Sequence, residues 1–278
     1  MRPSEDALRE GARWVLNLEH VPRGGTSGDH LGRGGGSSME FHDRRPYAPG
    51  DDVRHIDWRA LAKTDEVLVR VHREEVAPRL DLFVDTSLSM ATTEAKAQAA
   101  VDLATVLVQS AQSGGYDVRV VTLGDRALRI SMDELLREGL SFRSGRPLSD
   151  LIPDAGAEVR PSSVRLVLSD FLVPADPAHL VRPFGQGAGR VAMLQVLSPE
   201  DADPSASGAL RLVDAELGEI REVVVDSAAL SRYRDRLARL QSGLAEATQR
   251  HGGLFLTLPP GAPVAQSLTS LAAMGVVG

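Results

Sequence analysis

The stretch DLFVDTSLSMATTEAKAQAAVDLA, residues 81–104, joins an apolar run to a short polar segment and then to a helical pattern. A continuous apolar run of this length is typical of a strand that is covered on both faces in a parallel sheet. Beyond it, apolar residues recur at the i, i+3, i+4, i+7 spacing of a helix that buries one face. The stretch therefore predicts one strand followed by one crossover helix. Three polar side chains lie at the junction: Asp85, Ser87 and Ser89.

The rest of the chain repeats this alternation of strand and helix. Further apolar runs have the length and composition of strands: 117–123, 164–170, 190–197 and 254–259. Helical patterns separate most of these runs, including one over 227–250. Strands that alternate with helices predict right-handed crossovers. The expected fold class is therefore α/β, with a doubly wound, mainly parallel sheet and helices on both faces.

Two segments depart from the alternation. Residues 66–76 alternate valines with polar residues, as a half-exposed strand does. Residues 208–226 have the pattern of two strands joined by a turn at Glu216-Leu217-Gly218. We expect this hairpin to pair with the strand at 66–76 and to form a small antiparallel annex.

The chain is expected to comprise three regions. Residues 1–38 contain an N-terminal helix and a glycine-rich loop over 22–38, which lacks the lysine of a P-loop. Residues 39–78 form a charged segment that ends in the annex strand. Within it, Trp58 is expected to be a core anchor beside structural ion pairs. Residues 79–278 form the main α/β domain, with the hairpin as an insertion near 208–226.

Composition excludes several classes of protein. The 278 residues include no cysteine, which rules out disulfides, thiolate metal sites and a cysteine nucleophile. The 31 Lys and Arg against 38 Asp and Glu give a net charge of −7, which argues against a nucleic-acid binder. No apolar run approaches the roughly 18 residues that span a bilayer, and the N-terminus is too charged for a signal peptide. We therefore expect a cytoplasmic protein without a membrane span.

Two carboxylates are expected at one edge of the sheet. Ligands of open α/β sheets bind beyond the carboxyl ends of the strands, and Asp85 and Asp170 each close a predicted strand. Two such acids repel each other unless a hard cation lies between them, and serine hydroxyls can supply further oxygen ligands. The residues therefore predict a Mg²⁺ site, with Mn²⁺ or Ca²⁺ as alternative ions.

This arrangement resembles a known metal site. The pattern Asp85-x-Ser87-x-Ser89 after a buried strand, with Asp170 at a later strand end, resembles the metal-ion-dependent adhesion site of von Willebrand factor A-like domains. The resemblance implies that both serines bind the ion directly and that the aspartates act directly or through water.

A third hydroxyl is expected from another loop. In von Willebrand factor A-like domains this loop usually offers a threonine, often followed by Asp-Leu, and this chain has Ser149-Asp150-Leu151. The resemblance therefore assigns the third hydroxyl to Ser149, with Ser144 as the alternative. Ser149 could instead serve only as the N-cap of a helix.

A longer stretch resembles a second family. The sequence MEFHDRRPYAPGDDVRHIDWRALAKTDEVLVRVHREEV, residues 39–76, resembles the signature of the bacterial domain-of-unknown-function-58 family, and the likeness extends to residue 278. These are von Willebrand-like proteins commonly encoded beside MoxR-type AAA ATPases. The resemblance implies a non-enzymatic, chaperone-like adaptor. Its partner, a MoxR-type ATPase or that ATPase's client, would offer an Asp or Glu to the metal.

Two other functions compete with this reading. A Mg²⁺-dependent phosphatase-like hydrolase would use Asp85 as its nucleophile, but Ser87 stands where such enzymes usually carry a second acid. A scaffold protein would hold no ion, because Asp and Ser also favour turns and helix caps for local reasons.

Overall fold

The computed structural model describes residues 1–18, 43–49, 52–64, 66–71 and 77–278. The chain divides into two compact units, one formed by residues 1–24 with 77–278 and the other by residues 25–76. The glycine-rich loop predicted over 22–38 lies outside the described residues.

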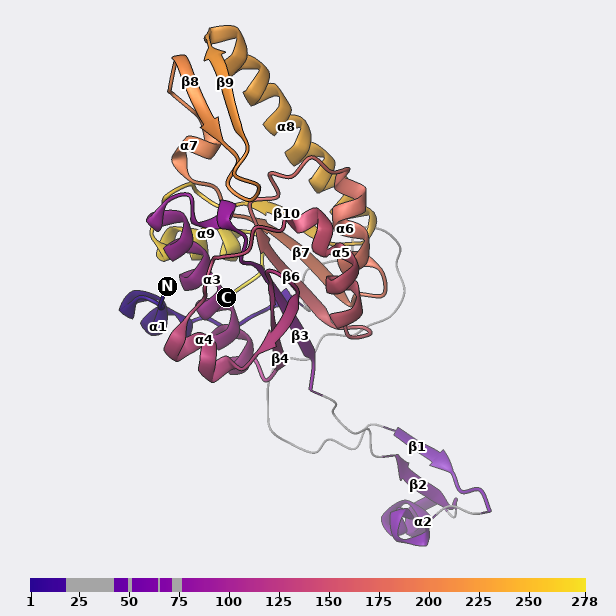
Figure 1. The fold of residues 1–278 in the computed structure, drawn as a ribbon. Helices are drawn as coiled ribbons and strands as arrows, with labels where there is room; N and C mark the ends of the chain where they lie inside the picture. Colours follow the sequence, from indigo (N-terminus) through magenta and orange to yellow (C-terminus); the bar gives the residue numbers. More distant parts are fainter. Residues whose placement is uncertain (19–42, 50–51, 65, 72–76) are drawn as a thin grey trace. The chain divides into compact units, whose positions relative to one another are not determined.

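A six-stranded sheet runs through the larger unit in the order β10-β7-β6-β3-β4-β5 (Figure 1). Its strands are β3 (Arg79–Asp85), β4 (Asp117–Leu123), β5 (Ala127–Ile130), β6 (Val164–Ser169), β7 (Arg190–Gln195) and β10 (Leu254–Thr257). Neighbouring strands pair in parallel, except that β5 is antiparallel to β4. The predicted α/β class and mainly parallel sheet are confirmed. The antiparallel edge strand β5 was not predicted.

Helices cover both faces of this sheet. They are α1 (Glu5–Gly11), α3 (Glu94–Ser113), α4 (Met132–Glu138), α5 (Leu148–Glu158), α6 (Pro177–Gly185), α7 (Pro199–Ala202), α8 (Ser227–Arg250) and α9 (Val264–Ala273). Among the helices that the structure describes, none combines the length and the apolar character of a membrane-spanning segment.

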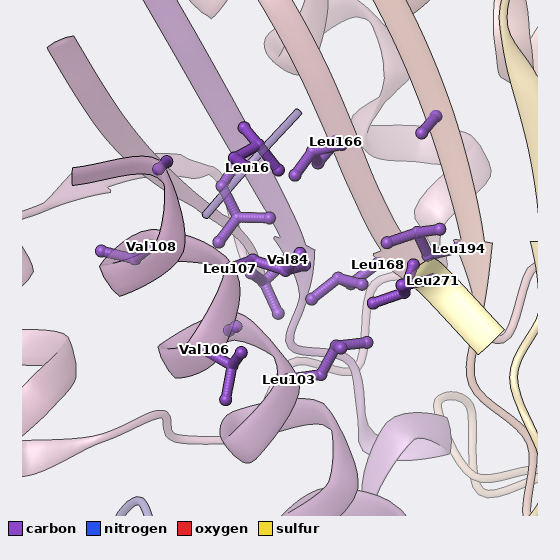
Figure 2. Close-up of a cluster of buried hydrophobic side chains, with 14 of the residues drawn as sticks. Leu16, Val84, Leu103, Val106, Leu107, Val108, Leu166, Leu168, Leu194 and Leu271 are labelled. Atoms are coloured by element: carbon purple, nitrogen blue, oxygen red, sulfur yellow. The ribbon is translucent and has the colours of Figure 1, made fainter. Parts of the chain in front are cut away.

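Two buried clusters lie on the two faces of β3 and contain its central apolar residues. Val84 points into the cluster under α3, where Figure 2 shows it with Leu107, Leu168 and other aliphatic side chains. Its neighbour Phe83 points the other way, into the cluster shared with α5, α6 and α8, where its ring packs edge-on against Phe184. Because successive strand residues face opposite sides, a strand buried on both faces is mostly apolar, and its buried polar residues, Asp81 and Asp85, have hydrogen-bond partners.

The polar segment after β3 is held between the sheet and α3. Thr93 caps α3, because its hydroxyl accepts a hydrogen bond from the backbone N–H of Lys96 at 3.2 Å. From there the helix buries one stripe of small and aliphatic residues against the sheet, and the helix ends at Gly114. The strand and the crossover helix predicted from this stretch are therefore both present.

The annex differs from the predicted one. Strands β8 (Gly208–Val213) and β9 (Ile220–Val225) pair only with each other among the described residues, so the predicted pairing of this hairpin with 66–76 is wrong. Strand β2 (Leu68–Val71) pairs instead with β1 (Asp43–Pro46). Pairing segments that are close in sequence costs less chain entropy than recruiting a distant hairpin. The small antiparallel annex is this β1–β2 sheet.

The smaller unit also contains the 3₁₀ turn η2 (Val53–His55) and helix α2 (Trp58–Thr64). Asp57 accepts hydrogen bonds from backbone N–H groups of the first turn of α2. Trp58 is 61% exposed, so its predicted role as a core anchor is wrong. The buried apolar residues here are smaller: Ile56, Ala60 and Val69.

Candidate functional site

The sheet brings Asp85 and Asp170 to the same rim. Strands β3 and β6 pair in parallel with Val84 opposite Leu168, so their carboxyl ends are adjacent. Both acids are buried, with 2% of Asp85 and 1% of Asp170 exposed. Burial, and then the nearby charge of Asp170, raise the pKa of Asp85 to about 6. The charge of Asp170 is therefore close enough to oppose the ionisation of Asp85.

Asp85 is bonded only by neutral donors. The Ser87 backbone N–H donates to its Oδ1 at 2.9 Å, and the Ser169 hydroxyl donates to its Oδ2 at 2.7 Å. These bonds lower the pKa of Asp85 but do not offset burial and the charge of Asp170. In the part of the chain that the structure describes, no basic side chain forms an ion pair with Asp85. At neutral pH this acid is a buried charge without a countercharge bonded to it.

The two serine hydroxyls are adjacent. Ser87 lies at the start of the 3₁₀ turn η3 (Leu88–Ala91), and its Oγ is 3.0 Å from Oγ of Ser89. Ligands that bind Mg²⁺ at right angles, with bonds near 2.1 Å, lie about 3.0 Å apart. The spacing of the hydroxyls therefore suits neighbouring positions of an octahedral shell, besides allowing a hydrogen bond between them.

The third loop brings Ser144 next to this pair. Residues 87 and 144 form an isolated parallel bridge, and the Leu88 N–H donates to the Ser144 carbonyl at 2.9 Å. Ser144 is 4% exposed, and its hydroxyl accepts a hydrogen bond from the Arg146 N–H. A hydroxyl from this loop is thus built into the same rim as Ser87.

Ser149 has a different environment. It lies in the first turn of α5, and its hydroxyl donates to Asp150 Oδ1 at 3.3 Å. The helix begins at Leu148 with Pro147 as its N-cap, so Ser149 is not the cap residue. Of the two hydroxyls considered for the third position, the structure joins only Ser144 directly to the backbone of the Ser87 turn.

A buried lysine holds the second acid. Lys96 Nζ lies 2.8 Å from Asp170 Oδ2, 2.7 Å from Asp201 Oδ2 and 3.0 Å from the Ser89 carbonyl oxygen. Burial alone lowers the pKa of Lys96, but Asp170 and Asp201 outweigh it, so the pKa is raised. Lys96 therefore stays charged, and its charge is directed at Asp170 and Asp201 rather than at Asp85.

The backbone after β6 aims Asp170 at this lysine. Asp170 Oδ1 accepts a hydrogen bond from the Leu172 N–H at 3.0 Å, while the Phe171 N–H donates to the Ser169 hydroxyl. Phe171 has a φ of 54°, a left-handed conformation that is costly for a bulky residue. This conformation turns the chain after the strand, and the bonds from Leu172 and Lys96 fix the Asp170 carboxylate.

The turn of the β8–β9 hairpin also reaches the rim. The Ser89 N–H donates to Glu216 Oε1 at 2.9 Å. A Cβ placed on Gly145 would lie 3.0 Å from the Glu216 carbonyl oxygen, so the turn rests against the loop that carries Ser144. A carboxylate from a distant insertion thereby contacts the backbone of the serine turn.

Sequence patterns missed three of these side chains: Lys96, Asp201 and Glu216. Lys96 left a signal, because it lies one helical turn before Ala100 on the apolar stripe of α3, where a charged side chain must be paired. Asp201 belongs to the short helix α7 and forms a capping box with Ser198. This local role gives no sign in the sequence that Asp201 also contacts Lys96. Glu216 gave no signal, because a turn glutamate is ordinarily solvated.

A hard divalent cation fits the oxygen donors of this rim. The described residues contain no group of three or more His, Cys, Asp or Glu that could hold a metal. An ion here would therefore rely on the hydroxyls as well as on carboxylates. Hydroxyl and carboxylate oxygens suit Mg²⁺, and the uncompensated charge of Asp85 provides an electrostatic reason for a cation to bind.

Comparisons with known proteins place the chain among uncharacterised relatives. The family described as "Protein of unknown function DUF58" matches residues 43–242. Uncharacterized proteins of Mycobacterium tuberculosis and Mycobacterium bovis are each 27% identical over 269 residues, which cover 87% of this chain and 81% of theirs.

Two solved structures are distantly similar. One is the conserved hypothetical protein BatB from Bacteroides thetaiotaomicron, with 15% identity and a TM-score of 0.41. The other is described as an aerotolerance-related membrane protein from Bacteroides fragilis, with 13% identity and a TM-score of 0.44. Each alignment covers 71% of this chain and 98% of the other.

Proposed function

The chain belongs to the DUF58 family, and from the geometry of its rim we propose that it is a non-enzymatic adaptor that binds a protein partner through a divalent cation. One observation carries the proposal. Within the described parts of the chain, Asp85 is a buried acid without a bonded countercharge, beside two serine hydroxyls 3.0 Å apart. Such an arrangement costs stability unless a proton or a cation compensates it.

The residues that would hold the ion come from three loops. Ser87, Ser89 and Ser144 supply hydroxyl oxygens, with Ser144 preferred to Ser149 because of its bridge to residue 87. Asp85 and Asp170 supply negative charge directly or through water. Mg²⁺ is the ion of choice for this oxygen set, with Mn²⁺ and Ca²⁺ as alternatives.

When bound, the ion supplies positive charge between the two acids and a coordination position for an external carboxylate. The chain's own residues keep the rim ready for this role. Lys96 fixes Asp170, and Ser169 and the Ser87 backbone fix Asp85. A partner Asp or Glu that completes the shell gains a charge-assisted contact, while the surrounding loops determine which partner fits.

The proposed partner comes from family resemblance. The pattern of Asp85, Ser87 and Ser89 resembles the metal-ion-dependent adhesion site of a von Willebrand factor A-like domain. On the same resemblance we propose a MoxR-type AAA ATPase, or the complex that this ATPase remodels, as the cytoplasmic partner. Binding would then serve assembly or maturation of the client.

Thermal unfolding with added Mg²⁺ tests the metal site. A ligand that binds only the folded state at 100 times its Kd adds about 2.7 kcal/mol to the free energy of unfolding. We expect Mg²⁺ to raise the Tm of the wild type and of Ser149→Ala, but not of Asp85→Ala or Ser87→Ala. An unchanged wild-type Tm would favour a metal-free scaffold.

Recovery of bound proteins tests the adaptor role. The tagged wild type should retain its partner in Mg²⁺ and release it in a chelator, and Ser87→Ala should not retain it in either condition. Recovery of the same partner regardless of chelator would contradict a metal bridge. Release of phosphate from an aryl phosphate by the wild type, but not by Asp85→Asn, would replace the proposal with the hydrolase.

A further inference from the structure

The β8–β9 hairpin contacts the rim through the carboxylate of Glu216. Figure 1 shows the hairpin projecting beside the start of α8, with its turn on the side of the body. Glu216 lies in that turn, and its Oε1 accepts the Ser89 N–H at 2.9 Å. Ser89 is also one of the two serines whose hydroxyls face each other in the proposed metal site. The glutamate therefore contacts the proposed site from outside the sheet.

The turn is built to present this glutamate. Asp214 Oδ1 accepts the N–H groups of Glu216 and Leu217 at 3.0 and 2.8 Å, and the Asp214 N–H donates to the Glu219 carbonyl at 2.8 Å. Gly218 adopts a φ of 68°, which favours glycine and closes the turn. These bonds fix the backbone around Glu216 without using its own carboxylate.

The carboxylate itself keeps unused acceptor capacity. Among the described residues, Glu216 Oε2 accepts no hydrogen bond, and no basic side chain pairs with Glu216. Within the part of the chain that the structure describes, the buried charged groups of the rim are Asp85, Asp170 and Lys96, and Asp201 pairs with Lys96. Glu216 adds a carboxylate beside Ser89, and a cation at the rim would favour its presence there.

From these contacts we propose that Glu216 is an internal ligand of the rim, occupying the position of the partner's carboxylate. The partner is then an acidic turn of another protein that takes the place of the turn at 214–219. The inference rests on the proposed metal-dependent function and names the partner's chemistry. Gly145 lets the backbone of such a turn approach closely, because a Cβ there would lie 3.0 Å from the Glu216 carbonyl oxygen.

Mn²⁺ binding to the full chain, measured by the paramagnetic resonance of the free ion, tests the ligand role. Glu216→Gln retains an acceptor for the Ser89 N–H but removes the charge, whereas Glu216→Ala removes both. We expect Mn²⁺ affinity to fall about tenfold or more in each variant, the scale seen when a group supporting a metal is lost. Glu219→Gln, an exposed acid of the same turn, should bind Mn²⁺ as the wild type does.

Hydrogen exchange at the Ser89 amide separates ligation from simple docking. The amide should be protected in the wild type and in Glu216→Gln, and should exchange faster in Glu216→Ala. Unchanged Mn²⁺ affinity in Glu216→Gln, with protection of Ser89 lost only in Glu216→Ala, would show a purely structural contact and overturn the ligand role. If the wild type binds no Mn²⁺, the proposed function has failed, and this inference falls with it.

Acetate tests replacement by an external carboxylate. Removing the internal carboxylate should open the position to acetate, so acetate should tighten Mn²⁺ binding to Glu216→Ala. It should leave the wild type and Glu219→Gln unaffected, since both retain Glu216. Equal effects of acetate on all three proteins would contradict the replacement of Glu216 by a partner.

Discussion

Two buried aspartates on the same strand have different hydrogen-bond partners. Asp81 and Asp85 both belong to β3, with 0% and 2% of their surfaces exposed. Asp81 Oδ1 lies 2.6 Å from Arg160 Nε, and its Oδ2 accepts the Arg160 N–H and the Ser163 hydroxyl at 3.0 and 2.7 Å. Asp85 receives only neutral donors.

The difference separates a structural acid from one that is available to a ligand. At the amino end of β3 a guanidinium neutralises Asp81 and also bonds Asp117. At the carboxyl end the only basic group bonded to the rim in the described chain is Lys96, and it is directed at Asp170 and Asp201. Burial of an acid is therefore not enough to identify a site, and the missing countercharge is the informative feature.

The largest expected effect comes from removing the countercharge of the structural acid. Arg160→Met leaves Asp81 buried and unpaired, and breaking a buried pair in this way costs about 3–5 kcal/mol. Urea denaturation should show this loss, while Mg²⁺ should still stabilise the variant as it does the wild type. A decrease of less than about 1 kcal/mol in the free energy of unfolding would mean that Arg160 is not an important countercharge for Asp81, and the proposed difference between Asp81 and Asp85 would be wrong.

Removing the lysine of the rim should have a somewhat smaller effect. Lys96→Met leaves Asp170 and Asp201 without their shared cation, and we expect unfolding to become easier by about 2–4 kcal/mol in a chelator. Mg²⁺ should recover more stability in this variant than in the wild type, because a competing positive charge is gone. Glu94→Gln, exposed in the same helical turn, is the control. Equal recovery in Lys96→Met and the wild type would separate Lys96 from the proposed site.

The stability of the metal-free protein should depend on the protonation of Asp85. Its folded pKa of about 6 lies above the ordinary value of 3.8, so its contribution is fully present below about pH 4 and is lost as pH rises through 6. The shift corresponds to a loss of about 3 kcal/mol. Asp85→Asn should escape this loss, so its stability advantage over the wild type should grow between about pH 5 and pH 7.5.

Denaturant unfolding in a chelator at both pH values measures this advantage. Added Mg²⁺ should reduce it, since an ion can replace the proton as the compensating charge for Asp85 in the wild type but not in the asparagine variant. An advantage for Asp85→Asn that is independent of pH would mean that Asp85 is compensated in the folded protein by some other group.

The smallest expected effect distinguishes two serines. Ser144→Ala removes a hydroxyl that is joined to the Ser87 turn, and we expect Mn²⁺ affinity to fall about tenfold. Ser149→Ala removes a hydroxyl that bonds Asp150, and it should bind Mn²⁺ as the wild type does. Calorimetric titration of both variants makes the comparison. The reverse order of effects would return the third hydroxyl to Ser149.

Most strands of the sheet could be predicted because a buried strand has a recognisable run of apolar residues in its own sequence. The apolar run that begins the stretch 81–104 lies in β3, which is buried from Leu80 to Asp85, and the run 117–123 matches β4, where Val120, Val121 and Leu123 are buried. The turn of the hairpin at Glu216 to Gly218 was likewise evident from local chemistry. Strand β5 was not predicted, because its residues are half-exposed or exposed at the sheet edge and form no continuous apolar run.

The contacts within the site could be predicted only in part. Asp85 and Asp170 follow from strand ends, which parallel pairing places side by side. The choice between Ser144 and Ser149 depends on how a loop crosses the rim, which no periodic pattern encodes. Lys96 and Glu216 reach the rim from a helix and from a distant hairpin, so their roles depend on packing between elements far apart in sequence.

Crystals grown with Mn²⁺ provide the most direct test of cation binding at the carboxyl end of β3. We predict an anomalous scattering peak next to Oγ of Ser87 and Ser89, between the loops that carry Asp85 and Ser144. The peak should be absent in Asp85→Asn. An ordered rim without a peak in Mn²⁺-saturated crystals, with the Ser87 and Ser89 hydroxyls still bonded to each other, would contradict the metal site.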